Sequence, residues 1–118
     1  MQPKTPGLLW DIEDAAKFIL EQAAGATYET YVQDRMLRLA VERNFGVIGE
    51  AARRLANHDP ETASRLSGLP RMIAYRNVLA HGYDEVNNAE VWEIIQDVLP
   101  TLKVEVEQLL REAEDGTP

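Results

Sequence analysis

The sequence contains no cysteine, which excludes disulfide bonds and zinc sites built on thiolates. It has no apolar run long enough to span a bilayer. Its first seven residues lack the basic region and apolar stretch that mark a secretory signal. The alternating pattern of strands is nearly absent. Together these absences favour an all-α cytoplasmic protein, and the lack of cysteine fits a reducing compartment.

The chain has only two histidines, and their positions do not form a metal site. His58 stands between Asn57 and Asp59-Pro60, a context typical of a surface loop. His81 ends an otherwise apolar helical segment. We therefore expect no metal and no cofactor.

The length of 118 residues fits one domain, residues 1–118, that can bury a core of its own. Hydrophobic residues make up 45% and charged residues 27%, the balance of a globular chain. We expect flexible ends at residues 1–6 and 112–118. No internal repeat or linker divides the sequence.

The net charge of −8 is unevenly distributed along the chain. Residues 34–76 hold eight arginines and five acidic residues, a net charge of +3, whereas the remainder holds four basic and fifteen acidic residues, a net charge of −11. An Arg-rich solvated helix face would explain the central excess, and so would a patch that attracts phosphate. The acidic ends would suit a basic protein partner.

Apolar residues at three- and four-residue steps predict an antiparallel bundle with four main helices and two short helical segments. The main helices are expected at Gly7–Ala24, Asp34–Ala56, Leu69–His81 and from Asn87 or Asn88 to the tail. The short segments are Tyr28–Gln33 and one that begins at Asp59-Pro60 and ends at Ser67-Gly68.

Residues with helix-end preferences mark the boundaries. Thr5 is predicted to cap the first helix, Asp34 the second, Asp59 the short segment after it and Asn87 the last. Pro100 falls inside the last helix, which it must kink or split.

The glycines and aromatic residues inside the predicted helices have an expected packing role, and one asparagine departs from the apolar pattern. Gly46 and Gly49 are expected to allow close helix packing, and Asn44 interrupts the apolar stripe of its helix. The aromatic residues are expected to pack in the core rather than stack on bases: Trp10, Tyr28, Tyr31, Tyr75 and Trp92.

The segment from Arg76 to Tyr83 gathers a guanidinium, a carboxamide, an imidazole and a phenol within eight residues. Asn77 and His81 are four residues apart and share a helix face, so Asn77 could orient the imidazole. Arg76 and His81 are five apart, about 140° around an ideal helix. Either the helix loosens near Gly82, or a second copy completes the site across a twofold axis, which predicts a homodimer.

These residue types suit RNA cleavage without a metal. A histidine can take the proton of a 2′-hydroxyl or protonate the leaving 5′ oxygen. An arginine stays protonated and meets phosphate oxygens with two parallel donors. The product would be a 2′,3′-cyclic phosphate, and DNA would not be cut. By spacing alone, His81 could equally be a helix C-terminal residue that interacts with the helix dipole.

The string Arg-Asn-x-x-x-His-x-Tyr at residues 76–83 resembles the Arg-x4-6-His-x-Tyr signature of HepT-like HEPN toxins. Three further stretches are similar to the same family: Arg43–Ala51, Val91–Ile94 and Asp97–Pro100. The resemblance extends from about Leu8 to Leu110, in order and without a large insertion.

The resemblance implies a HEPN-like helical-bundle homodimer with ribonuclease activity, the toxin of a type VII-like toxin–antitoxin system. Arg76 and His81 would be catalytic, with Asn77 in support. Tyr83 would receive AMP from a nucleotidyltransferase antitoxin, which silences the toxin by adding bulk and negative charge beside the histidine. Asn44 and Glu50 would line the groove.

Two other functions fit the same residues. The chain could be a HEPN nucleotide-binding or scaffolding partner of a nucleotidyltransferase, in which Arg76 and His81 hold phosphate without cutting RNA. It could also be a structural dimerisation bundle with His81 and Tyr83 at the interface. The second is disfavoured because Arg, Asn and His crowded at one helix end are costly unless exposed or paired.

Overall fold

A computed structural model describes residues 1–81 and 86–115, leaving the side chains of residues 80 and 81 outside the description. The described residues form seven helices and no strand, which confirms the all-α prediction. The helices are α1 (Thr5–Ala23), α2 (Tyr28–Gln33), α3 (Arg35–His58), α4 (Pro60–Ala63), α5 (Leu69–His81), α6 (Asn88–Asp97) and α7 (Leu99–Glu114). None of them, within this part of the chain, is long and apolar enough to cross a membrane.

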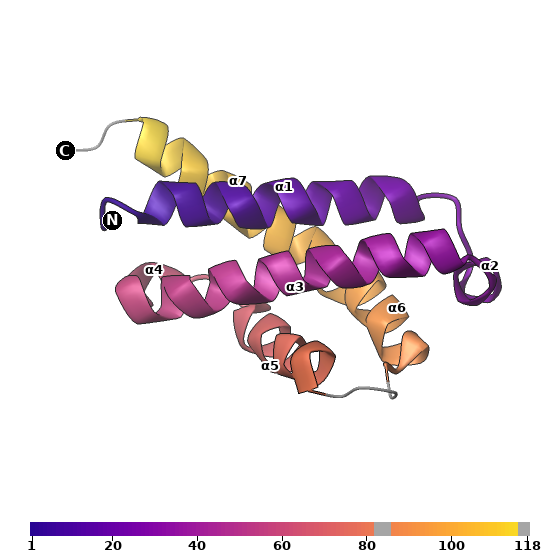
Figure 1. Ribbon diagram of the computed structural model, residues 1–118. Coiled ribbons are helices and arrows are strands. Elements are labelled where there is room, and N and C mark those ends of the chain that lie inside the picture. The colour runs from indigo at the N-terminus through magenta and orange to yellow at the C-terminus, as the bar shows by residue number, and fades with distance from the viewer. Residues whose placement is uncertain (82–85, 116–118) are drawn as a thin grey trace.

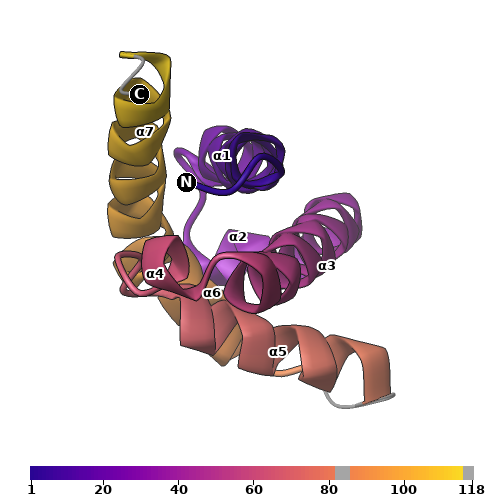
Figure 2. The same ribbon diagram turned by 90° about the vertical axis from the view of Figure 1, so that its left-hand side faces the viewer.

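The two longest helices, α1 and α3, lie side by side and antiparallel (Figure 1). Helix α7 packs on α1, and α5 packs on α3. Figure 2 shows α5 running across α3, with its C-terminal end projecting from the body of the molecule.

One apolar core joins α1, α3, α6 and α7, because each helix carries apolar residues at three- and four-residue spacing. Fully buried members include Ile12, Ile19, Phe45, Ile48, Leu55, Ile94, Leu102 and Val106. Tyr31 and Trp92 add a ring contact with 5.4 Å between their centroids. Burial of this apolar surface is the main driving force for the fold.

Three predicted helix caps are confirmed by hydrogen bonds. Asp34 accepts from the Leu37 amide at 3.0 Å, Asp59 from the Thr62 amide at 3.1 Å, and Asn87 from the Glu90 amide at 3.0 Å. Each acceptor serves an amide that the first helical turn leaves without a backbone partner. Helix α3 runs to His58, two residues past the predicted end, so His58 is helical and not part of a loop.

Thr5 does not cap α1 as predicted, because its hydroxyl bonds to a distant residue. Thr5 is the first residue of α1 and Lys4 is the cap position. The Thr5 hydroxyl donates to Asp59 Oδ2 at 2.8 Å, and the Gln2 amide donates to the same oxygen at 3.1 Å. These bonds fix residues 2–5, inside the range expected to be flexible, to the start of α4.

Pro100 splits the last predicted helix into α6 and α7, because its ring cannot continue the hydrogen-bond ladder. Helix α7 then continues to Glu114, into the range 112–118 that was expected to be flexible. Arg65 and Glu112 form an ion pair at 2.7 Å that ties this end to the region after α4. Ordered helix therefore extends further than the polar composition of the tail suggests.

The aromatic residues divide into two groups. Tyr31 and Tyr75 are buried, Trp92 is half-buried against Tyr31, and all three pack as predicted. Trp10 and Tyr28 are exposed, at 55% and 37%, so the packing prediction is wrong for these two within this chain.

Candidate active site at the crossing of α3 and α5

The close approach of α5 to α3 depends on Gly49. A methyl group at this position would overlap the Cβ of Arg76 and lie 3.0 Å from the Met72 carbonyl oxygen. Gly46, one turn earlier, faces open space, and a methyl group there would meet nothing within 4 Å. The packing role predicted for both glycines is thus confirmed for Gly49 and wrong for Gly46. Because Gly49 has no side chain, Arg76 of α5 packs directly against the backbone of α3 at this point.

The Glu50 carboxylate stands at this crossing and binds three arginines. Its Oε1 lies 3.1 Å from Nη2 of Arg76. Its Oε2 lies 2.8 Å from Nη2 of Arg53 and 3.0 Å from Nε of Arg54. We call Glu50, Arg53, Arg54 and Arg76 the Glu50 cluster. With one carboxylate and three guanidiniums, it carries a net charge of +2.

The cluster keeps Glu50 ionised. The hydrogen bond from Arg53 is the largest cause that lowers the pKa of Glu50, to about 2, with the bond from Arg54 and the charge of Arg76 acting in the same direction. Partial desolvation opposes these effects without outweighing them. The net charge of the cluster is therefore constant across the physiological pH range.

Arg76 is anchored at one side and accessible at the other. Its side chain is 32% exposed, while Nη2 is held by Glu50. Its Nη1 donates to Oδ1 of Asn77 in a long bond of 3.5 Å. Asn77 is exposed, and its described side-chain hydrogen bond is this one with the Arg76 guanidinium. An accessible guanidinium positioned in this way can present donors to an oxyanion.

Buried aromatic packing supports the placement of α5. Tyr75 lies in an edge-to-face contact with Phe45 of α3, with 5.7 Å between ring centroids. Arg71, further back on α5, forms an ion pair at 2.6 Å with Glu93 of α6. Arg76 therefore sits on a helix that is fixed to two others, which limits its freedom before any ligand binds.

Position 81 is the last residue of α5, but the His81 side chain lies outside the described residues. Tyr83 also lies outside them. The pairing of Asn77 with the imidazole and the meeting of Arg76 with His81 therefore stay predictions. In the helical register, positions 77 and 81 fall on the same face of α5.

Of the two expected groove residues, the structure brings Glu50 to Arg76 and places Asn44 elsewhere. Asn44 donates from Nδ2 to the Ala40 carbonyl oxygen at 2.8 Å. It lines a separate hollow with Asp14, Lys17 and Phe18 of α1. Six residues separate Asn44 from Glu50, about 240° around the helix, which explains why they face different neighbours.

Arg53 and Arg54 belong to the site, although the sequence alone did not single them out. Their spacing from Glu50, three and four residues along one helix, is the signal that could have identified both contacts. The contact with Arg76 had no comparable local signal, because it joins α3 to α5. In the described part of the chain, no three histidine, cysteine or carboxylate side chains gather closely enough to hold a metal ion.

The outer face of α5 has no extensive neighbour within the described chain, because this helix packs chiefly on α3. Pro70, Ala74, Asn77 and Val78 share this face and are exposed. Val78, the largest apolar residue of this group, is 40% exposed. The face is mostly apolar or small, and it adjoins Arg76.

Comparison with known proteins gives one consistent result. The family described as Ribonuclease HepT-like matches residues 12–109. A candidate RNase of Methanocaldococcus jannaschii is 32% identical over 84% of this chain and 90% of its own length. A candidate RNase of Caldanaerobacter subterraneus is 31% identical, over 92% and 96%. A candidate ribonuclease HepT of Thermococcus cleftensis is 30% identical, over 86% and 91%. No solved structure matches.

Proposed function

Because the chain belongs to the HepT-like ribonuclease family, we propose that it is a metal-independent RNA endonuclease in which Arg76 and His81 act on one phosphodiester. The observation that carries this proposal is the Glu50 cluster, which holds an accessible arginine on the same helix that ends at position 81. Its net positive charge would attract a phosphate to this helix on an otherwise acidic protein.

In the proposed reaction, His81 takes the proton of the 2′-hydroxyl, which attacks the adjacent phosphorus. The P–O5′ bond breaks, and the leaving 5′ oxygen takes a proton from the solvent, to which His81 releases the proton that it removed. Arg76 donates to the non-bridging oxygens, whose charge grows in the transition state. The products are a 2′,3′-cyclic phosphate and a 5′-hydroxyl. Asn77 supports Arg76 through the contact between its amide oxygen and the guanidinium.

We propose that the working form is a homodimer joined through the outer face of α5. Exposed small and apolar residues on this face, Ala74 and Val78 among them, would be buried against a second copy. Arg76 and His81 lie about 140° apart on a regular helix, so a second α5 can supply the group that one helix cannot. Each active site would then combine Arg76 of one subunit with His81 of the other.

We further propose that the protein is a cytoplasmic toxin of a type VII-like system, silenced when a nucleotidyltransferase antitoxin transfers AMP to Tyr83. The modification would add a negatively charged group two residues after His81. Such a group competes with substrate phosphate for the Glu50 cluster and repels the RNA strand. We therefore expect the negative charge that AMP adds at Tyr83 to stop substrate binding.

Cleavage of a labelled RNA oligonucleotide in EDTA tests the enzymatic proposal. His81→Ala is expected to abolish both cleavage and growth arrest, with an unchanged thermal unfolding midpoint and oligomeric state. Arg111→Ala, which removes one cation from the distant helix α7, serves as the matched control and is expected to cut like the wild type. A wild-type protein that binds AMP or ATP but leaves RNA intact would favour the scaffolding alternative.

Mixing two inactive variants tests the shared active site. Arg76→Ala and His81→Ala proteins are each expected to be inactive. If each site spans two subunits, a heterodimer of the two variants retains one site with an intact arginine and an intact histidine. Random exchange of equal amounts makes half of the dimers heterodimers, so mixing restores up to about a quarter of the wild-type activity. If both residues act within one subunit, the mixture stays inactive and the two-subunit site is wrong.

Intact-mass measurement after co-expression with a candidate nucleotidyltransferase antitoxin tests the regulation. Adenylyl increments are expected on the wild type and are expected to vanish in Tyr83→Phe. Tyr28→Phe, which changes an exposed tyrosine of α2, is the control and should keep the increments. Increments that persist in Tyr83→Phe would assign the modification to another residue.

A further inference from the structure

A groove runs between α1 and α3 on the side of the molecule that carries the Glu50 cluster. It consists of two hollows, with volumes of about 710 Å³ and 250 Å³, that share Leu8, Asp11 and Arg54. The larger hollow reaches Lys4 and His58, and the smaller one reaches Arg43 and Glu50. Because the two hollows share lining residues, they form one continuous groove, the α1–α3 groove.

Cationic side chains dominate the lining of this groove. Lys4, Arg43, Arg53 and Arg54 line it together with two carboxylates, those of Asp11 and Glu50. Glu50 is already bound by arginines. The groove therefore carries a net positive charge in a chain whose net charge is −8. A polyanion would be attracted here and repelled by most of the remaining surface.

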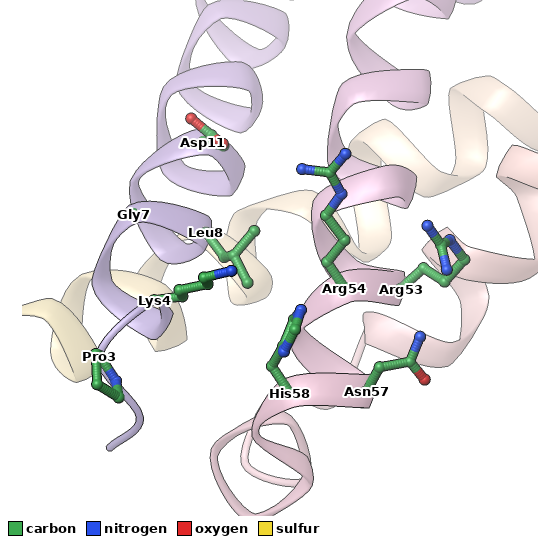
Figure 3. A pocket seen from close by; sticks show the side chains of 9 residues that line it. All are labelled: Pro3, Lys4, Gly7, Leu8, Asp11, Arg53, Arg54, Asn57 and His58. Carbon is green, nitrogen blue, oxygen red and sulfur yellow. The ribbon is translucent and has the colours of Figure 1, made fainter.

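The close-up in Figure 3 shows that Lys4, just before α1, and Arg54 and His58 of α3 point toward the space between the two helices. Arg54 donates from Nε to Glu50, while its other two guanidinium nitrogens have no acceptor among the described residues. Its side chain is 59% exposed. These donors can reach a phosphate without breaking the ion pair with Glu50.

The groove passes the proposed active site and leads away from it. Glu50, which holds Arg76, lines the smaller hollow, and His58 lines the far end of the larger one, eight residues later on α3. At 1.5 Å per helical residue, this distance is about 12 Å. That length exceeds the needs of a single phosphate group and matches an extended ligand. Among the described residues that line it there is no phenylalanine, tyrosine or tryptophan on which a base could stack.

We propose that the α1–α3 groove binds the backbone phosphates of the RNA strand that flanks the scissile phosphate. This inference rests on the proposed ribonuclease function and adds the path that the substrate takes across the protein. Lys4 and Arg54 would contact successive phosphates. Since phosphate contacts position a strand without reading its bases, the groove would raise affinity for all sequences alike.

Binding of labelled single-stranded RNA to the His81→Ala protein tests the groove without cleavage. Lys4→Gln combined with Arg54→Gln is expected to weaken binding of a twelve-nucleotide RNA by about tenfold near 0.1 M salt. The slope of log K against log salt should become shallower by about 1.4. Binding of a dinucleotide should change much less, because it is too short to extend from the active site into the groove.

Arg65→Gln with Arg111→Gln is the matched control, because it removes the same charge from two residues that do not line the groove. This control is expected to bind the twelve-nucleotide RNA and the dinucleotide as the wild type does. Lys4→Gln alone is a second test, since Lys4 does not contact Glu50 and its loss leaves the cluster intact. Thermal unfolding confirms that each variant is folded.

Equal binding of long RNA by the groove variants and the control would overturn the groove proposal. So would a groove that binds AMP as tightly as the twelve-nucleotide RNA, because the proposed ligand is a strand. The ribonuclease proposal fails by a different result, the absence of cleavage by wild-type protein. The two failures are distinguishable because binding is measured in the cleavage-deficient background.

Discussion

Asp59 and Glu50 are two carboxylates nine residues apart, one at the end of α3 and one within it, and their surroundings differ. Asp59 is 6% exposed and accepts hydrogen bonds from neutral donors: the hydroxyls of Thr5 and Thr62 and the amides of Gln2 and Thr62. Glu50 has a side chain that is 31% exposed, and its partners are three guanidiniums. Asp59 therefore stabilises the fold, whereas Glu50 positions three arginine side chains at the surface.

Both carboxyl groups have a lowered pKa, for different reasons. Burial raises the pKa of Asp59, but its hydrogen bonds outweigh burial and hold the value well below the usual range. The Arg53 hydrogen bond is the main cause for Glu50. A perturbed pKa therefore does not by itself identify a functional site, and the chemistry of the partners separates a structural carboxylate from a functional one.

Replacement of Asp59 should produce the largest loss of stability. Asp59→Ala removes the cap of α4 and leaves the buried Thr5 hydroxyl without its acceptor. The expected cost in the free energy of unfolding is about 3 kcal/mol. Urea denaturation measures it. A cost below about 1 kcal/mol would contradict a structural role for Asp59.

Substitution of the two glycines of α3 should give opposite results. Gly49→Ala forces α5 away from α3 and should cost about 2 kcal/mol while reducing cleavage, because it displaces Arg76. Gly46→Ala is the matched control, since its methyl group meets open space and a helical alanine gains up to about 1 kcal/mol. Equal unfolding midpoints for the two variants would show that the helices are not in close contact at Gly49.

Replacement of Glu50 should affect activity more than stability, the reverse of Asp59. Glu50→Ala removes the group that holds Arg76, and cleavage is expected to fall about tenfold from lost positioning. The unfolding midpoint should change little, because the ion pairs are near the surface. A large loss of stability with unchanged cleavage would reverse the roles assigned to the two carboxylates.

Acid should weaken the fold through Asp59. Because its pKa is lowered in the folded state, its contribution is present above the unfolded value of about 3.9 and is lost as pH falls further. The urea midpoint should therefore decrease below about pH 4, and less steeply in Asp59→Asn. The remaining slope comes from Glu50 and Glu112, whose pKa values are lowered to about 2. Identical slopes in the two proteins would exclude this contribution.

Local chemistry made much of the fold predictable from sequence. The caps at Asp34, Asp59 and Asn87 each bond to an amide three residues later, so the residue type and its neighbours suffice. Pro100 breaks its helix for equally local reasons. Apolar periodicity located the main helices for the same reason, since one face of each must be buried.

Contacts between distant segments were not predictable in the same way. The Thr5 hydroxyl bonds to Asp59, 54 residues away, and not to its own helix. Glu50 was expected in the groove, but its bond to Arg76 requires the close approach that Gly49 allows. Asn44 shares the helix of Glu50 but lines a separate hollow, and its amide donates to Ala40 of its own helix.

The central claim is that an arginine anchored by Glu50 acts on an RNA phosphodiester. Its most direct test is the rate of cleavage of an RNA oligonucleotide by wild-type and Arg76→Ala protein in EDTA, with the product ends identified by mass. We predict a 2′,3′-cyclic phosphate from the wild type and a rate at least about 100-fold lower for Arg76→Ala. Intact RNA with the wild type, or equal rates for the two proteins, would contradict the account.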